Sequence, residues 1–507
     1  MKSIYNTIRI FCAACMLCGF TACGEKIPQN YAESDELPAI YPDYTNVTVP
    51  QNMAPLTFEW DGKSDGIVAR LTAGNNVVVC DGSKIQPGTS EWKGLVKSAL
   101  GQQKKAIEVE VYAKKNKLWT RYKPFNIYIS SDSIDAYISY RLIPPSYVVY
   151  EDLTINQRCL ENYDESVVYN NMLCTEGGNG QCINCHNYQQ YNPERMQFHA
   201  RQNLGGTIIA YDGKIQKVNM RNDSILSAGV YPTWHPWLKL IVYSTNMTAQ
   251  SFHTINPNKV EVFDTQSDLI AYDVEKNEVT TIENDPSELE CFPFWAPDGK
   301  TLYYCSAHFE YRDTTDHGQE FLTRTEEVRY NLYKKDFDPE TLQFGPRQLV
   351  FDADAIGKSA TLPRISPDGR YLMFTLAQYG VFHIWHHDAD IWLLDLQTGN
   401  ARPMEEINST DTESYHSWSS NGRWVVFSSR RYDGNYTRPF IAHIDSNGHG
   451  SKPFELPCAD PDYHRQFLKC YNIPEFMRGP VTITPQRFAS TIKQDAKPVK
   501  YASKLSK

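Results

Sequence analysis

Three residues with the chemistry of a haem attachment site stand close together in the chain. Cys182, Cys185 and His186 form the pattern Cys-x-x-Cys-His, which is the attachment pattern of a c-type haem. On a helix, positions i, i+3 and i+4 share a face, so two thioether bonds and one imidazole can meet the same porphyrin edge and iron. Composition gives roughly 0.009 chance occurrences of this pattern in 507 residues. The pattern therefore predicts one haem c, bound through Cys182 and Cys185, with His186 as the proximal iron ligand.

Two other interpretations of the same pattern involve no haem. Cys182 and Cys185 have the spacing of a local disulfide. Cys174, with the three motif residues, also supplies the donor types of a structural zinc site. Haem is the first prediction, and the disulfide and the zinc site are its alternatives.

An electron-carrying haem needs a second axial ligand, and the segment after the motif offers two. Asn192 can cap a short helix and Gly205 can end it. Met196 and His199 would then share one helix face, within reach of an iron held by His186. We prefer His199, because methionine in an amphipathic helix more often packs in the core. Met196 is the alternate and would raise the potential; another histidine or an open coordination site are the remaining options.

A second cluster of metal-ligating side chains lies between Phe382 and Asp390. It contains His383, His386 and His387 with two aspartates. Such density suits a metal, but in loops between strands it more often serves hydrogen bonding. The chain has no phosphate-binding glycine loop, nucleophile elbow or His-Glu-x-x-His helix. We therefore expect an electron carrier or a binding protein rather than an enzyme.

The first residues predict export. Lys2 and Arg9 precede the apolar run 10–20, which is too short to span a membrane and is typical of a signal peptide. The run ends in Phe-Thr-Ala before Cys23, a pattern that resembles a bacterial lipobox and predicts lipidation of Cys23. An ordinary signal peptide with an incidental Cys23 is the alternative. We assign 1–22 to the signal and 23–45 to a tether, which places the protein in the bacterial cell envelope, anchored by lipid, facing the periplasm and on the outer membrane.

Nine cysteines follow the lipobox, and an oxidising compartment favours their pairing. Spacing suggests Cys159–Cys174, Cys291–Cys305 and Cys458–Cys470, with Cys80 left over, although spacing does not settle connectivity.

Internal repeats indicate the fold that must position these residues. Three segments contain a strand, a turn dipeptide and a second strand; the dipeptides are Asp298-Gly299, Asp368-Gly369 and Asn421-Gly422. A fourth copy, at 233–244, lacks the turn signal. A further strand pair follows each hairpin, and four strands per repeat make a propeller blade. Segments 137–170 and 205–220 can supply additional blades, for about six to seven in all.

This pattern divides the chain into an all-β succession of units. Residues 46–132 alternate apolar and polar side chains and predict a small β-sandwich. Residues 133–457 form the expected β-propeller, interrupted by a short helical haem insertion at 171–204. Residues 458–507 are the expected closing segment and tail.

The Trp-x-Pro-Asp-Gly-Lys turns resemble the TolB-type, WD40-like propeller repeats, and the motif with the lipobox resembles lipoproteins of anaerobic gut-type bacteria that carry one Cys-x-x-Cys-His insertion beside such repeats. The resemblance implies a c-type cytochrome of the periplasm or envelope. Our first hypothesis is a lipid-anchored carrier of one haem that transfers electrons in the envelope and whose propeller docks a redox partner. The alternative is a non-redox propeller scaffold that binds envelope proteins, with the Cys-x-x-Cys-His element structural or metal-binding. Nucleic acid is excluded as a main partner, because 60 acidic residues outnumber 50 basic ones.

Overall fold

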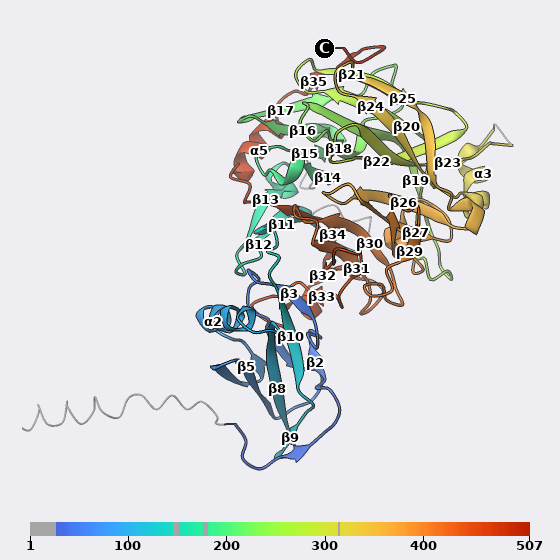
Figure 1. Ribbon diagram of the computed structural model, residues 1–507. Coiled ribbons are helices and arrows are strands. Elements are labelled where there is room, and N and C mark those ends of the chain that lie inside the picture. The colour runs from blue at the N-terminus through green and yellow to red at the C-terminus, as the bar shows by residue number, and fades with distance from the viewer. Residues whose placement is uncertain (1–26, 146–151, 176–180, 313–314, 507) are drawn as a thin grey trace, which may run out of the picture.

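The computed structural model describes residues 27–145, 152–175, 181–312 and 315–506, and these are mostly strands (Figure 1). The predicted signal peptide and the predicted lipidation site Cys23 lie outside the described residues. In the described part of the chain, no helix is both long and apolar enough to cross a membrane.

The N-terminal domain is built on a mixed sheet in the order β1-β9-β8-β10-β3, with β5 and β6 attached to β8. Helix α2 (Thr89–Leu100) packs on this sheet with Trp92 and Leu95 fully buried, and this helix was absent from the predicted sandwich. A second sheet joins β2, β4 and β7. The strands are β1 (Ala32–Glu33), β2 (Ile40–Tyr41), β3 (Thr48–Pro50), β4 (Phe58–Trp60), β5 (Gly66–Ala73), β6 (Asn76–Gly82), β7 (Lys84–Ile85), β8 (Ala106–Lys115), β9 (Leu118–Arg121) and β10 (Phe125–Ser130).

The predicted tether, 23–45, is wrong for its described part. β1 pairs with β9, and β2 pairs with β4. Tyr44 is completely buried in the core of the domain. Apolar side chains between Ile40 and Val47 make burial more favourable than a solvated chain, so the domain begins well before residue 46.

The rest of the described chain forms four-stranded antiparallel units, six in number, five of which run in chain order. A single parallel bridge, Ser267 to Leu289, joins two of them. The five are β14–β17 (Ile183–Tyr188, Met196–Ala200, Gly206–Tyr211, Lys214–Asn219), β18–β21 (Gly229–Trp234, Leu240–Phe252, Val260–Asp273, Glu278–Glu283), β22–β25 (Glu288–Trp295, Thr301–His308, Asn331–Asp338, Gln343–Phe351), β26–β29 (Ser359–Ile365, Tyr371–Ala377, Asp390–Asp395, Ala401–Pro403) and β30–β33 (Glu413–Trp418, Trp424–Ser429, Arg438–His443, Phe454–Glu455).

The sixth unit joins the two ends of this series. β34 (Cys470–Met477) pairs antiparallel with β11 (Tyr137–Ile143), which continues to β12 (Thr154–Cys159) and β13 (Glu165–Asn170). The first strands of the units, here called the inner strands, contact one another in the cyclic order β14, β18, β22, β26, β30, β34. The arrangement is propeller-like, and the C-terminal segment completes it, as the sequence predicted for 458–507.

The expected loose tail is ordered. Helix α5 (Pro485–Ile492) buries Phe488 and Ile492 against the β13 and β17 region, where Figure 1 shows it beside β13. β35 (Lys497–Pro498) adds to β17, and β36 (Lys500–Tyr501) adds to β21. The remaining short helices are α3 (His317–Arg324) and α4 (Tyr463–Gln466).

The turn dipeptides are confirmed as hairpin turns. Gly299, Gly369 and Gly422 adopt φ values of +58°, +74° and +67°, which only glycine takes without strain. The predicted helical insertion at 171–204 is wrong, because β14 and β15 hold the motif and its following segment in a strand pair. Alternation of Met196, Phe198 and Ala200 toward one hydrophobic cluster favours a strand over a helix here.

Candidate functional site

The six inner strands share one irregularity. In each, two residues lie opposite one on the neighbouring strand, which defines a β-bulge. One non-glycine residue in each bulge adopts φ between +47° and +56°. These residues are Cys185, Tyr231, Phe292, Leu362, Tyr415 and Ile473.

The residue after each bulge position is proline or histidine. Four of the inner strands have proline there, and the other two have His186 and His416. Proline in a sheet is confined to edges and bulges because it donates no backbone hydrogen bond. Cys185 and His186 therefore occupy the repeating bulge-and-proline position of their unit.

The bulges turn their side chains into a common space at the centre of the propeller-like ring. All six bulge residues, with His186, line a cavity of about 30 Å³. An engineered cavity of about 150 Å³ holds benzene, so this much smaller space admits water but no porphyrin.

His186 and His199 lie on opposite faces of the β14–β17 sheet. His186 is buried beside the backbone of Ser139 in β11 and Ile473 in β34, and neither carbonyl makes a hydrogen bond of ordinary geometry to it. His199 faces the other way, bonded to Thr207 at 2.9 Å and 5.7 Å from the ring of Tyr243. Burial lowers the pKa of each histidine to about 3, so both rings are neutral.

The cysteines of the motif also diverge. Cys182 packs against the hydrophobic cluster that contains Met196 and Tyr169. Cys185 points toward the backbone of Tyr231 in β18, and burial raises the pKa of its thiol. Successive strand residues point to opposite faces, and the bulge rotates Cys185 and His186 further.

The residues present do not fit a haem c held by Cys182, Cys185, His186 and His199. The two thiols and the two imidazoles face different sides of one sheet, and His186 adjoins no cavity of porphyrin size. The 530 Å³ cavity beside His199 is lined by Arg201 and Arg221 but not by His186. Met196 faces the same side as Cys182, yet it is completely buried among apolar side chains.

The described residues also do not form the disulfide or the zinc site that were the alternatives to haem. All nine cysteines there are free, so the Cys182–Cys185 disulfide and the three suggested pairs are absent. No group of three or more histidine, cysteine, aspartate or glutamate side chains in the described chain is arranged to hold a metal. His386 instead pairs with Glu261 at 3.2 Å, and His387 pairs with Asp411 at 2.8 Å.

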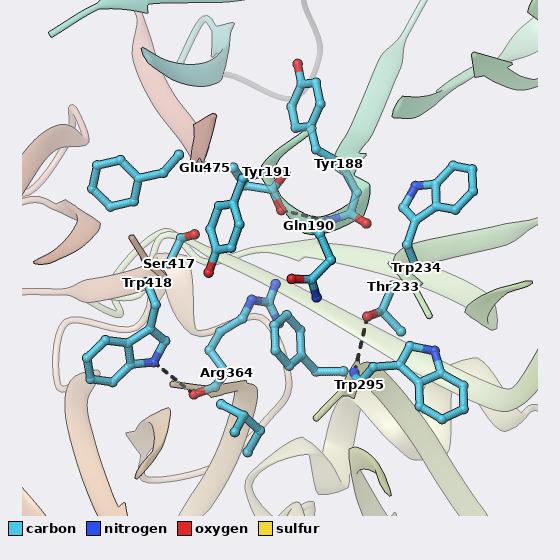
Figure 2. A pocket seen from close by; sticks show the side chains of 14 residues that line it. Tyr188, Gln190, Tyr191, Thr233, Trp234, Trp295, Arg364, Ser417, Trp418 and Glu475 are labelled. Atoms are coloured by element: carbon cyan, nitrogen blue, oxygen red, sulfur yellow. Dashed lines mark hydrogen bonds between the residues drawn. The ribbon is translucent and has the colours of Figure 1, made fainter. Parts of the chain in front are cut away.

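A second hollow opens next to the central cavity, where the inner strands end. This channel mouth has a volume of about 90 Å³, and Figure 2 shows its side chains converging from several strands. The guanidinium of Arg364 points into its centre, toward Gln190 and Tyr191. Its wall is aromatic, and its principal residues are Gln190, Tyr191, Phe294, Trp295, Trp418 and Glu475.

Arg364 places a positively charged guanidinium at the channel mouth. Burial lowers the pKa of its guanidinium and outweighs the carboxyl of Glu475, which raises it. Within the described chain, Glu475 does not come close enough to Arg364 to form an ion pair. It stacks on Phe294 at 4.8 Å and donates a hydrogen bond to the carbonyl of Pro363 at 2.9 Å. Most of its donors therefore remain available to a ligand in the hollow.

Glu475 lies on the wall shared by the channel mouth and the central cavity. Burial raises the pKa of this carboxyl to about 7. Oε1 accepts a hydrogen bond from Asn187 at 2.8 Å, and Oε2 has no hydrogen-bond partner. The mouth thus pairs a fixed positive group with a carboxyl that titrates near neutrality.

The rim of the mouth holds backbone strain. Gln190 and Tyr191 adopt φ of +49° and +63°, a region that is costly for side chains of this size. Tyr191 stacks with Arg478 at 5.8 Å, which helps to hold this conformation.

Sequence reasoning did not select Arg364 or Glu475. Both occupy the first aligned position of the hairpin repeat, where the other inner strands have Asn187, Thr233, Phe294 and Ser417. The available signal for a binding site was a charged side chain at that position in two of the six inner strands. It carries meaning only once the ring brings six such positions together.

No protein-family model matches the chain, and no curated protein matches it significantly. Solved structures that resemble it include prolyl oligopeptidase B from Galerina marginata (TM-score 0.34, 10% identity, 68% of this chain and 42% of that one). Another is the β-propeller domain of Cps50 (Swd1) from Myceliophteria thermophila (TM-score 0.27, 10% identity, 55% of this chain and 86% of that one). A third is an endo-arabinase from Bacteroides thetaiotaomicron (TM-score 0.25, 12% identity, 52% of this chain and 89% of that one). This chain thus spans less than half of the oligopeptidase.

Proposed function

We propose that this protein is an exported, lipid-anchored six-bladed propeller that binds a partner protein in the bacterial envelope. The contact is the channel mouth, which receives a carboxylate-bearing residue of an extended partner segment. The observation that carries the proposal is Arg364, a half-buried guanidinium that points into the hollow and forms no ion pair in the described chain, although Glu475 acts on its pKa.

A carboxylate is the ligand that Arg364 lacks. Burying an unpaired charge is costly, and a guanidinium offers a carboxylate two parallel hydrogen bonds. The arginine is held at the centre of the hollow, so the side-chain entropy that binding would cost is already lost. The amide of Gln190 and the hydroxyl of Ser417 line the same hollow and add donors.

The size and lining of the mouth favour one inserted residue rather than a whole ligand. About 90 Å³ holds one side chain or chain terminus, with the rest of the segment outside. The indoles of Trp295 and Trp418 and the ring of Tyr191 supply the aromatic surface that peptide-binding sites favour.

The sequence prediction of haem-based electron transfer is not carried into this function, because the motif residues do not fit the haem. Export and lipidation enter the proposal from the signal and lipobox patterns. We expect Cys23→Ser to move the protein from membranes to the soluble fraction with its circular dichroism spectrum unchanged. Variant protein that still pellets with salt-washed membranes would contradict the anchor.

Blocked tripeptides and intrinsic tryptophan fluorescence test the binding site. Acetyl-Gly-Glu-Gly-amide should change the emission in a saturable way, and the uncharged Gln counterpart should not. Acetyl-Gly-Gly-Gly with a free carboxylate distinguishes a chain terminus from an acidic side chain as the source.

Two variants complete that experiment. Arg364→Met should weaken binding of the acidic peptide at least about tenfold, the loss of a charged hydrogen bond. Arg487→Met removes an exposed arginine on α5 and should leave binding unchanged. Equal binding of the Glu and Gln peptides, or unchanged binding by a folded Arg364→Met protein, would overturn the proposal.

A further inference from the structure

A second cysteine–histidine pair lies at the junction of the N-terminal domain with the propeller-like ring. The Sγ atom of Cys458 lies 3.5 Å from Nε2 of His464 and 3.3 Å from Nη1 of Arg158. The Nδ1 atom of His464 lies 2.5 Å from Oε1 of Glu455. Thiol, imidazole and carboxylate thus form a line, and a guanidinium stands on the other side of the sulfur.

The charges around the sulfur favour its anion. Burial by itself opposes ionisation, but His464 and Arg158 outweigh it, and the pKa of the Cys458 thiol is lowered. For His464, burial is likewise outweighed by Cys458 and Glu455, which raise its pKa to about 9. The other groups that face this site are tyrosines. The hydroxyl of Tyr471 lies 3.0 Å from Nε2 of His464, and Tyr140, Tyr163 and Tyr463 lie near Cys458.

Among the nine cysteines that the structure describes, the others lack this arrangement. Burial raises the pKa of Cys80 to about 11 and raises that of Cys185 as well. Cys80 and Cys182 are nevertheless more exposed than Cys458, which keeps 7% of its surface. Exposure therefore predicts reaction at Cys80 or Cys182, whereas charge predicts reaction at Cys458.

We propose that Cys458 is an oxidation site for small hydroperoxides, held as a thiolate by Arg158 and the His464–Glu455 pair. The sulfur attacks one oxygen of hydrogen peroxide, and the S–O bond forms as the O–O bond breaks. The protonated His464 gives its proton to the departing hydroxide, which leaves as water. The sulfur is oxidised by two electrons to a sulfenic acid, the peroxide is reduced, and His464 is left neutral.

Oxidation here would act on the domain junction. The hydroxyl of Thr57 donates to the carbonyl of Cys458 at 2.5 Å, and Arg158 donates to the carbonyl of Pro457. On the same side, the hydroxyl of Tyr44 donates to the carbonyl of Glu455 at 3.3 Å. A neutral sulfenic acid no longer attracts Arg158 or His464, so the contacts between the two parts should weaken.

The test is peroxide treatment of the full chain with dimedone present, followed by peptide mapping on a mass spectrometer. Dimedone should label Cys458 at least tenfold faster than Cys80 or Cys182. His464→Asn and Arg158→Met should slow this labelling at least tenfold, and Cys470→Ser should leave it unchanged. Faster labelling of Cys80 or Cys182 would overturn the proposal.

The wild-type protein alone also decides the matter if those variants do not fold. Below the pKa of an ordinary thiol, about 8.5, the thiolate fraction rises nearly tenfold per pH unit. A thiolate held by Arg158 and His464 should instead be labelled at nearly the same rate at pH 6.5 and 7.5. A tenfold rise for Cys458 between these values would overturn the proposal.

Discussion

The chain contains two buried cysteine–histidine pairs, and they differ in charge. Cys185 and His186 are adjacent in the sequence. Burial raises the pKa of the thiol, outweighing Arg201 and Arg141, and burial together with Arg141 lowers the pKa of the imidazole, so both groups are neutral. Cys458 and His464 stand six residues apart, yet His464 and Arg158 lower the pKa of the thiol, while Cys458 and Glu455 raise the pKa of the imidazole. The difference shows that the chemistry of such a pair depends on which charges the fold brings to it, rather than on its spacing.

The largest expected effect concerns haem, which the Cys185–His186 pair should not bind. Because the motif residues face different sides of a sheet, we expect protein matured in a host with haem-attachment machinery to show no reduced α-band. In-gel peroxidase staining after denaturation should also be absent. A covalent haem that disappears in the Cys182→Ala/Cys185→Ala variant would contradict the geometry and restore the sequence prediction.

Next in size is the effect of breaking the ionised pair. Arg158→Met leaves the Cys458 thiolate without its guanidinium and removes the hydrogen bond to Pro457. Loss of one partner from a buried charge pair costs about 3–5 kcal/mol, which urea denaturation should detect. The control Arg487→Met, on an exposed position of α5, should change stability by less than about 0.5 kcal/mol.

A smaller effect concerns Glu475, on the wall of the cavity that Cys185 and His186 share. Its pKa is about 7, above the ordinary value of 4.5, so the folded protein holds a proton there that the unfolded chain has lost. This contribution to stability is full below about pH 4.5 and is lost as pH rises through 7.

The same titration should affect peptide binding. Above pH 7 the ionised Glu475 repels a ligand carboxylate, so affinity for acetyl-Gly-Glu-Gly-amide should fall about threefold to tenfold between pH 6 and 8. Glu475→Gln should bind equally at both values. Fluorescence titrations at the two pH values check this, and an unchanged slope in the variant would assign the titration to another group.

The smallest expected effect is that of His186→Pro. Four of the six inner strands have proline at this position, so the substitution should change the free energy of unfolding by less than about 1 kcal/mol. Thermal melting followed by circular dichroism measures it. Severe loss of stability in the proline variant would mean that the imidazole does more than fill a bulge position.

Local sequence signals were sufficient for the repeats. The dipeptides at Gly299, Gly369 and Gly422 need a positive φ that glycine supplies, so the hairpins follow from four or five residues each. The sequence also assigned 458–507 as the closing segment, and within it β34 pairs with β11.

The prediction of a helix around the motif was wrong, because strand pairing stabilises this segment more than helix capping would. Asn192 and Gly205 are compatible with a helix, but β15 lies between β14 and β16, and its apolar residues fill the core only as a strand. The bulge at Cys185 cannot be seen in its own five residues. It appears when six inner strands are compared.

The sequence by itself determined the repeats, their turns and the all-β class of this protein, since these depend on neighbours a few residues apart. Only the tertiary structure decided which charged side chains lie next to one another. Arg158 reaches Cys458 across 300 residues of chain, and Arg364 and Glu475 meet at the channel mouth from β26 and β34. Because electrostatic energy falls with distance in space and not along the chain, the reactive thiol and the unpaired guanidinium exist only in the closed ring.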